Sequence, residues 1–116
     1  MIFNIGGGRP MQWAMGTAPQ SEGVMTISHM AFRPYAVVAR PGDGGVGGLS
    51  AICTLYLIDP DDDSVVLAKR KASSGSDFSA MSSSDYSWNE STMTLTLRVA
   101  ASSNTATQAS YYAIGR

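Results

Sequence analysis

The sequence predicts an all-β protein: a two-layer β-sandwich of jelly-roll type over residues 21–116, preceded by an extended N-terminal arm over residues 1–20. Three observations favour this fold. Only 15% of the 116 residues are charged, against about 25% in an ordinary soluble domain, and twelve residues are glycine. Short alternations of apolar and polar residues recur between turn signals. No segment sustains a helical period of 3.6 residues with capping residues at its ends.

The expected arm consists of short apolar pieces separated by chain breakers. The run from Gly6 to Pro10 interrupts the first piece, and Gly16 closes the second. Phe3 and Trp13 are large apolar side chains in a segment that lacks a long element. We therefore expect both to pack on the body of the domain or on another subunit, because they would otherwise form an exposed apolar patch.

Residues 24–40 predict two strands joined at a corner. Met25 and Ile27 alternate with polar residues, which is the period of a half-buried strand. Pro34 interrupts the pattern because proline has no amide hydrogen for a ladder and holds the preceding residue in extended geometry. Residues 35–39 then form a nearly continuous apolar run, which is typical of a strand covered on both faces.

Residues 49–59 form the strongest candidate for a central strand. Cys53, Leu55 and Leu57 point to one face, and Ile52, Tyr56 and Ile58 point to the other. Both faces are apolar, so we expect a second sheet to cover one of them and a subunit or the arm to cover the other. The candidate residues of an oligomer interface are Phe3, Trp13, Ile52, Tyr56 and Ile58.

Further strands are expected at residues 65–68, 86–88, 92–99 and 105–114, and loops at 41–48 and 72–85. Residues 92–99 alternate most regularly. One face is apolar and the other polar, and the two sets are Met93, Leu95, Leu97 and Val99 against Thr92, Thr94, Thr96 and Arg98. This pattern predicts a strand with one face on the core and one in water.

Charge and hydropathy exclude several classes of function. The net charge is −1, so the chain has no basic field that would hold nucleic acid or an anionic membrane. No apolar run approaches the roughly 18 residues of a membrane-spanning helix, and we expect no signal peptide. The single cysteine, Cys53, lies within an expected strand and is interpreted as a buried small apolar residue.

The chain offers little material for a catalytic or metal centre, so we expect neither an enzyme nor a cofactor. His29 is the only histidine and has no nucleophile motif beside it, so it is interpreted as a strand-end residue with a backbone partner. The turn from Asp59 to Asp63 contains four aspartates, whose oxygens a calcium ion could use. It lacks the full pattern of an EF-hand loop, so a solvated turn is favoured over a cation site.

One cluster of residues predicts a ligand or receptor contact. Tyr86, Trp88 and Asn89 lie close together in sequence next to a turn, and exposed aromatic and amide groups on loops bind carbohydrates. The competing interpretation is that these aromatic residues fill the edge of the sandwich. A free carbohydrate-binding, lectin-like module is therefore an alternative function.

Three segments of the chain, MIFNIGGG, ISHMAFRPYAVVAR and ASYYAIGR, resemble segments of small β-rich virion proteins of tailed bacteriophages and prophages. Tail-fibre and tail-tip domains of this kind have a strand, a Gly-Phe-x-Pro corner and a valine-rich strand, and they close on a Tyr-x-Ala-x-Gly-like strand. Here the corner is Ala31 to Pro34, with Ala31 in place of the usual glycine, and the closing strand is Tyr111 to Gly115.

The resemblance implies a homo-oligomeric β-sandwich, often a trimer, that is assembled in the bacterial cytoplasm and located in the virion. It implies a structural role at the tail tip, fibre or baseplate, with a contribution to attachment to a host glycan or receptor, and no catalytic residue. The expected partners are copies of the chain and other virion proteins. A capsid decoration protein is the alternative within the same class.

Overall fold

The computed structural model describes residues 10–46, 52–72 and 75–116, and these residues confirm the all-β class. Nine strands within the described ranges form one antiparallel sheet in the order β6-β5-β4-β3-β9-β1-β2-β8-β7. The strands are β1 (Gln12–Ser21), β2 (Val24–Ile27), β3 (Pro34–Pro41), β4 (Cys53–Ile58), β5 (Val65–Lys71), β6 (Phe78–Ala80), β7 (Tyr86–Asn89), β8 (Thr94–Arg98) and β9 (Gln108–Gly115). Among the residues that the structure describes, the only helical element is the single 3-10 turn η1 (Ser83–Asp85).

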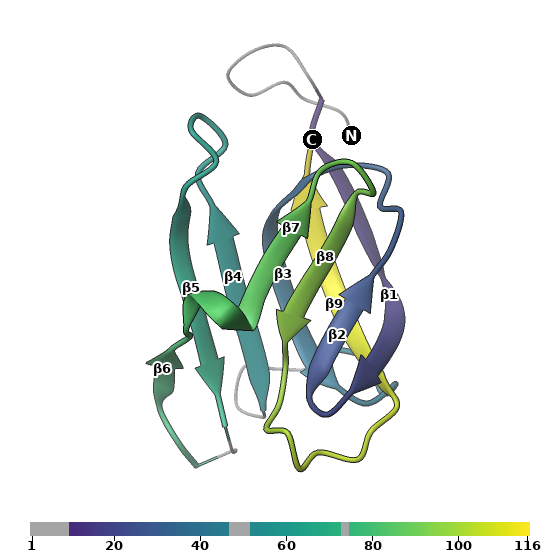
Figure 1. Cartoon of the computed structure of the whole chain (residues 1–116), viewed down its shortest axis with the longest axis vertical. Helices are drawn as coiled ribbons and strands as arrows, with labels where there is room; N and C mark the ends of the chain where they lie inside the picture. The colour runs from purple at the N-terminus through teal and green to yellow at the C-terminus, as the bar shows by residue number, and fades with distance from the viewer. Residues whose placement is uncertain (1–9, 47–51, 73–74) are drawn as a thin grey trace.

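The sheet curls over so that its two ends face each other as two layers (Figure 1). The larger layer contains β6, β5, β4, β3, β9 and most of β1, and the smaller layer contains β2, β8 and β7. Strand β1 joins them, because its residues Gln12–Pro19 pair with β9 and its last two residues pair with β2. The described strands thus follow one another in a single hydrogen-bonded order, and a jelly-roll arrangement is not confirmed.

The extended N-terminal arm is not confirmed either. From Gln12 onward the segment is a ten-residue strand that lies between β9 and β2, and the expected domain boundary after residue 20 falls inside it. Its backbone hydrogen bonds are made with β9, which is almost one hundred residues away in sequence, so local pattern gave no indication of them. Residues 1–9, including the candidate interface residue Phe3, lie outside the described residues.

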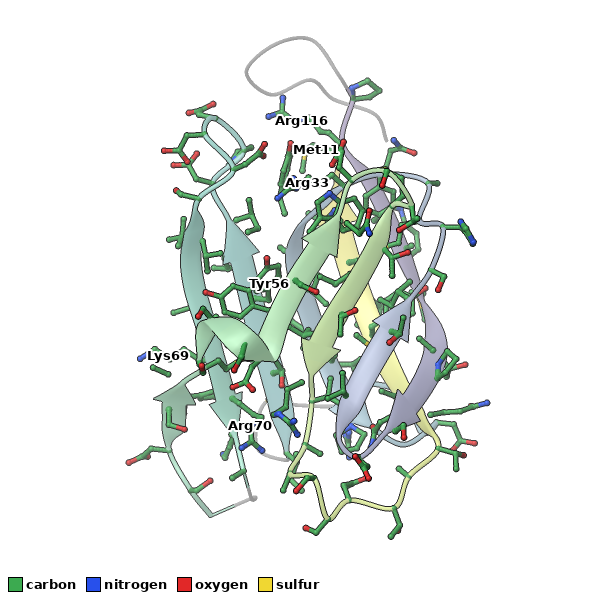
Figure 2. All side chains as sticks on the ribbon, viewed as in Figure 1. Met11, Arg33, Tyr56, Lys69, Arg70 and Arg116 are labelled. Carbon is green, nitrogen blue, oxygen red and sulfur yellow. The ribbon has the colours of Figure 1, made fainter. Side chains whose placement is uncertain are left out.

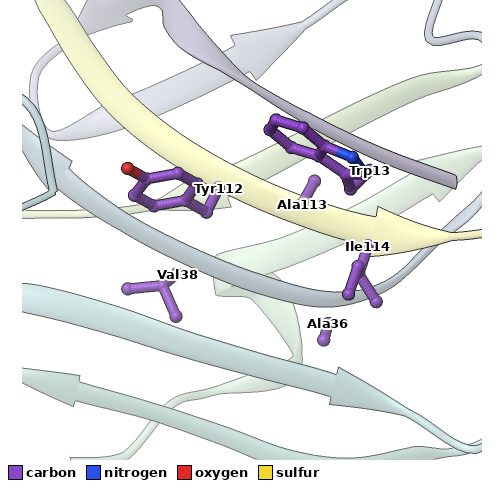
Figure 3. Close-up of a pocket in the computed structure, with 6 residues that line it drawn as sticks. All are labelled: Trp13, Ala36, Val38, Tyr112, Ala113 and Ile114. Atoms are coloured by element: carbon purple, nitrogen blue, oxygen red, sulfur yellow. The ribbon is translucent and has the colours of Figure 1, made fainter. Parts of the chain in front are cut away.

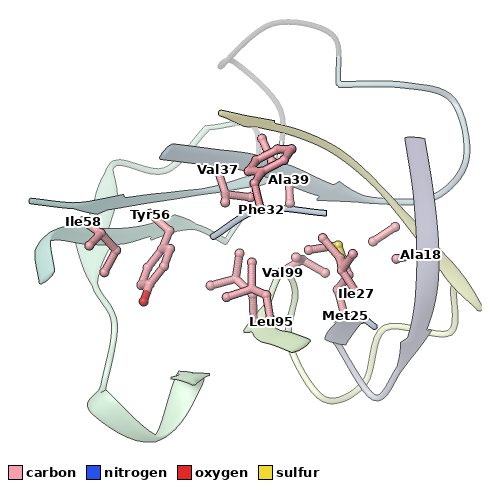
Figure 4. Close-up of a cluster of buried hydrophobic side chains, with 13 residues drawn as sticks. Ala18, Met25, Ile27, Phe32, Val37, Ala39, Tyr56, Ile58, Leu95 and Val99 are labelled. Carbon is pink, nitrogen blue, oxygen red and sulfur yellow. The ribbon is translucent and has the colours of Figure 1, made fainter. Parts of the chain in front are cut away.

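Side chains from both layers form the core (Figure 4). Met25, Leu95 and Leu97 are completely buried, as is Val99 just after β8, so the alternation expected in residues 24–27 is confirmed, and that in residues 92–99 is confirmed from Thr94 onward. Thr92 and Met93 lie in the preceding turn, where Met93 has a φ of 50°. The larger layer contributes inward-facing residues to the same cluster, namely Ala18, Val37, Ala39, Tyr56, Ile58, Ala109 and Ala113. Burying these apolar side chains stabilises the sandwich by about 25 cal/mol per Å² removed from water.

The expected corner at Phe32-Arg33-Pro34 carries the chain from the smaller layer to the larger one. Phe32 inserts into the core and is 4% exposed. At the start of β3, Arg33 and Arg116 exchange two backbone hydrogen bonds of 3.1 Å each, which ties the corner to the last residue of the chain. Two of the three segments that carry the family resemblance are therefore neighbours, because β3 pairs with β9.

The structure shows which of the two apolar faces of strand β4 is turned toward the core. Tyr56 and Ile58 are 3% and 5% exposed and point into the core of this chain, so neither presents its side chain to another subunit. The Tyr56 ring contacts the Tyr86 ring from the smaller layer at a centroid distance of 5.2 Å. The Thr54 hydroxyl donates a hydrogen bond of 2.9 Å to the carbonyl of Arg98, which links the two layers a second time.

Because Cys53 and Tyr56 are ionisable and buried, we expect the fold to lose stability at alkaline pH. Burial raises the pKa of the Cys53 thiol above its ordinary value of 9.0, against an opposing effect of Lys71 and Arg40, and raises the pKa of the Tyr56 phenol above 10.0. As the pH rises past these ordinary values, the unfolded chain loses its protons first and is stabilised relative to the fold. The free energy of unfolding should therefore fall above pH 9.0, by up to about 1.4 kcal/mol per pH unit and group.

Urea titrations at several alkaline pH values measure this decline. The double variant Cys53→Ala and Tyr56→Phe removes both ionisable groups and should decline less steeply than the natural chain. Equal slopes for the two proteins would contradict the prediction.

Candidate functional site

The outer face of the larger layer is apolar, although it is not turned toward the core. Two rows of directly opposed residues cross five neighbouring strands on this face. The first row is Trp13, Ile114, Ala36, Leu57 and Leu67, and the second is Met15, Tyr112, Val38, Leu55 and Lys69. Directly opposed residues of an antiparallel sheet lie on the same side, so nine apolar or aromatic side chains are adjacent. We call these nine residues the outer apolar face.

Five of these side chains are substantially open to solvent. Trp13 is 68% exposed, Met15 57%, Tyr112 45%, Ile114 43% and Leu57 37%. These residues face away from the core because their strands are apolar at both odd and even positions, and a strand can turn only one set inward. A sheet with such a second apolar face is expected to be covered by something else.

A shallow groove of about 300 Å³ crosses the outer apolar face (Figure 3). The Trp13 indole from β1 lies on one side of it, and Tyr112 and Ile114 project from β9. Ala36 and Val38 on β3 also line it, and the small Ala36 side chain leaves room above the sheet. The groove is thus suited to an apolar side chain rather than to a charged ligand.

The smaller layer shows the opposite pattern on its own outer face. There, Thr26 and Ser87 lie on either side of Thr96 across three strands. Arg98 on the same strand forms an ion pair with Asp85, at 3.2 Å between Nε and Oδ1. The smaller layer is therefore hydrated outside, as residues 92–99 predicted, and the apolar surface is confined to the larger layer.

A polar row limits the outer apolar face at one end. The row contains Thr17, Ser110 and Arg40. Residues 42–45 fold onto it, since the Ser110 hydroxyl donates to the Gly42 carbonyl at 2.8 Å and accepts from the Gly45 amide at 3.1 Å. Ser110 is consequently only 2% exposed.

A cluster of charged and aromatic groups occupies the opposite end of the molecule, around Arg33 (Figure 2). The Arg33 guanidinium lies 5.5 Å from the centre of the Trp88 ring, 3.6 Å from a carboxylate oxygen of Glu90 and 3.9 Å from one of Asp63. The Arg116 guanidinium lies over the Tyr35 ring at 5.5 Å and donates to the Pro60 carbonyl. These groups bind one another and hold the corner, the acidic turn and the end of β7 together.

The three residues expected to form a ligand contact are all engaged within the chain. Tyr86 packs against Tyr56 in the core. The Trp88 ring nitrogen donates to Glu90, and the ring packs on the core cluster. Asn89 accepts hydrogen bonds from Ser91 and Thr92 and so organises the following turn. The packing of the two aromatic residues agrees with the interpretation that they fill the edge of the sandwich, whereas Asn89 is exposed.

The acidic turn uses its carboxylates to build the turn itself. Asp59 accepts from the amide of Asp61 at 2.8 Å, and Asp62 accepts from the amide and hydroxyl of Ser64. The hydroxyl bond from Ser64 is the main reason that the pKa of Asp62 is lowered. Within residues 10–46, 52–72 and 75–116, no group of three or more His, Cys, Asp or Glu is placed to hold a metal ion.

The structure separates the residues expected to form an oligomer interface. Trp13 lies on the outer apolar face, Tyr56 and Ile58 lie in the core, and Ile52 is half-buried just before β4. Sequence reasoning missed Met15, Ala36, Val38 and Ile114 as members of a common surface. The available signal was the apolar character of both faces in residues 35–39 and 49–59, together with the adjacent Tyr111 and Tyr112, whose side chains a strand must point to opposite faces.

Comparisons with known proteins found no match that would indicate a function. No family model matches the sequence, and no curated protein or solved structure matches it. Across the part of the chain that the structure describes, no helix has the length and apolar character needed to span a membrane.

Proposed function

We propose that the chain is a structural protein of a tailed-bacteriophage virion: a homo-oligomeric β-sandwich of the tail tip, fibre or baseplate that contributes to host attachment. The observation that carries the proposal is the outer apolar face, with Trp13 68% exposed at one side of it. A protein that works as a free monomer gains nothing from such a face, whereas a component of a permanent assembly has it covered.

The family resemblance adds support from the pairing of its segments. The corner at Arg33 and Pro34 belongs to one resembling segment, and Gly115 and Arg116 belong to another. In the fold, Pro34 is opposite Gly115, and Arg33 exchanges backbone hydrogen bonds with Arg116. The similar residues therefore form one structural unit at the start of β3 and the end of β9. A unit of this kind gives a physical reason for the segments to occur together.

The proposed role is structural rather than catalytic, and its surface chemistry agrees with this. The outer apolar face offers side chains for packing, and the charged groups around Arg33 are paired with one another. The lectin-like alternative draws little support from its three candidate residues, since Tyr86 and Trp88 pack against the core and the exposed Asn89 side chain accepts hydrogen bonds from the following turn.

A protein inventory of purified particles tests the proposal. Phage particles induced from a host that encodes the chain are banded on a density gradient, and their proteins are quantified by mass spectrometry against a known tail subunit. We expect the chain at a fixed, small multiple of that subunit. Its absence from infectious particles would end the proposal.

Antibody-gold labelling of the same particles tests the position. We expect gold at the distal end of the tail. Gold spread over the head would instead assign the chain to the capsid decoration proteins, against the tail position proposed here.

A further inference from the structure

We propose that the outer apolar face is the contact surface of a two-fold homodimer, in which this face packs against the same face of a second copy. The inference deepens the proposed function, on whose expectation of self-assembly it rests, by naming the surface, the partner and the symmetry. Three properties of the face lead to a second copy as its occupant: its shape, its charge and its area.

The shape of the face is complementary to itself. Two sheets pack face to face when their side chains interdigitate at a separation of about 10 Å, so the apolar sheet face of one copy can pack against that of another. Trp13 projects from the face, while the neighbouring groove over Ala36 is hollow and apolar. In a two-fold interface, a contact from one residue of the first copy to a second residue of its partner is repeated in the reverse direction. The Trp13 side chain of each copy can therefore enter the groove of the other.

The charge of the face favours a neutral apolar partner. Lys69, at the far side on β5, is the single charged residue in the two rows. Charged residues are depleted at the centres of protein interfaces, and two copies meeting here bring no like charges together around Trp13 and Tyr112. Lys69 and the neighbouring Arg40 are basic groups at one border of the face, but the chain as a whole has a net charge of −1 and so no general attraction to an anionic lipid surface.

The area is sufficient for the centre of a stable dimer. With about 200 Å² for a large apolar side chain, the exposed fractions of Trp13, Met15, Leu57, Tyr112 and Ile114 leave on the order of 500 Å² open. A stable interface buries about 800 Å² on each partner, or about 10% of a small protein's surface. The half-buried Val38 and Leu55 and the polar row that contains Thr17 can supply the remainder as a rim.

Sedimentation equilibrium of the purified full chain tests the dimer. The chain has a mass of 12.2 kDa, so we expect a species of twice that mass. The variant Trp13→Lys puts a charge in place of the most exposed large apolar side chain of each half of the interface, and we expect its dissociation constant to rise at least about 100-fold. Trp13 lies on the surface, so its replacement should not disturb the fold. The circular dichroism spectrum and thermal midpoint of Trp13→Lys should match those of the natural chain at a concentration where both proteins are monomeric.

The matched control is Thr105→Lys, which adds the same charge at an exposed position in the loop before β9. It should remain a dimer. A monomeric natural chain, a trimer, or a dimer that Trp13→Lys leaves intact would each overturn the inference. So would a monomer that binds uncharged phosphatidylcholine vesicles through Trp13, since the occupant would then be lipid. The particle inventory and the sedimentation experiment test the two proposals separately. If the chain is a dimer but is absent from particles, the proposed function is wrong. If the chain is present in particles but is monomeric in solution, the dimer inference is wrong.

Discussion

Replacing Gly115 by alanine should lower the free energy of unfolding by about 3 kcal/mol or more. A Cβ atom at this position would lie 1.8 Å from the carbonyl oxygen of Arg33 and 2.8 Å from the Cα of Pro34. Both contacts are with backbone, so no side chain can rotate away to relieve them. The backbone itself is held by the two hydrogen bonds between Arg33 and Arg116, which the clash must break or stretch.

Urea unfolding of Gly115→Ala measures this effect, and Gly16→Ala is its control. Gly16 lies on β1, next to β9, and a Cβ atom there would come no closer than 3.6 Å, to the Tyr111 hydroxyl. The control should change stability by less than about 1 kcal/mol, because the new methyl group makes an ordinary contact and strand glycines are weakly unfavourable. A Gly115→Ala variant as stable as Gly16→Ala would show that the start of β3 can move, and that the close approach is not needed.

The strands of the smaller layer were predictable because each reports its own environment. Leu95, Leu97 and Val99 face the core and alternate with Thr94, Thr96 and Arg98, which face water. An alternation of this kind arises whenever one face of a strand is buried and the other is hydrated. The sequence therefore contained both the strand and its orientation, without knowledge of its neighbours.

Strand β4 could be predicted, but the identity of its inner face could not. Leu55 and Leu57 on one face are as apolar as Tyr56 and Ile58 on the other. The sequence therefore predicts a strand but does not indicate which of its two faces is buried. The choice is made by the second layer, where the Tyr86 ring meets Tyr56. For this reason two candidate interface residues belong to the core, and the surface lies on the opposite side of the same strand.

Strand β1 is the element that the sequence concealed. Gly16 and Pro19 are turn signals on a local reading, yet both lie in a strand that pairs with β9 over eight successive positions. Proline is tolerated here because it lies near the point where β1 leaves β9 and begins to pair with β2. The outer apolar face depends on this strand, since Trp13 and Met15 join it only through pairing with Ile114 and Tyr112.

We expect Gly23→Ala to destabilise the fold by about 3 kcal/mol or more, or to prevent folding at all. Glu22 and Gly23 form the two-residue turn that joins β1 to β2, and both have positive φ angles, 51° and 81°. This geometry matches the right-handed twist of a hairpin, and glycine adopts it without steric cost. The turn also receives the end of β8, because the Gly23 carbonyl accepts from the amides of Val99 and Ala100.

The expected cost has two parts, and Gly42→Ala separates them. A Cβ atom at Gly23 would lie 2.2 Å from the carbonyl oxygen of Ala100, whereas at Gly42, with a φ of 96°, it would meet nothing within 4 Å. The control therefore contains only the cost of a positive φ for alanine, about 1 to 2 kcal/mol. Urea unfolding of the two variants gives the clash by difference. If Gly23→Ala does not fold, Gly42→Ala must still fold, because nothing blocks its methyl group. Equal losses in the two variants would mean that the end of β8 can withdraw from the turn, and that this contact is looser than its hydrogen bonds indicate.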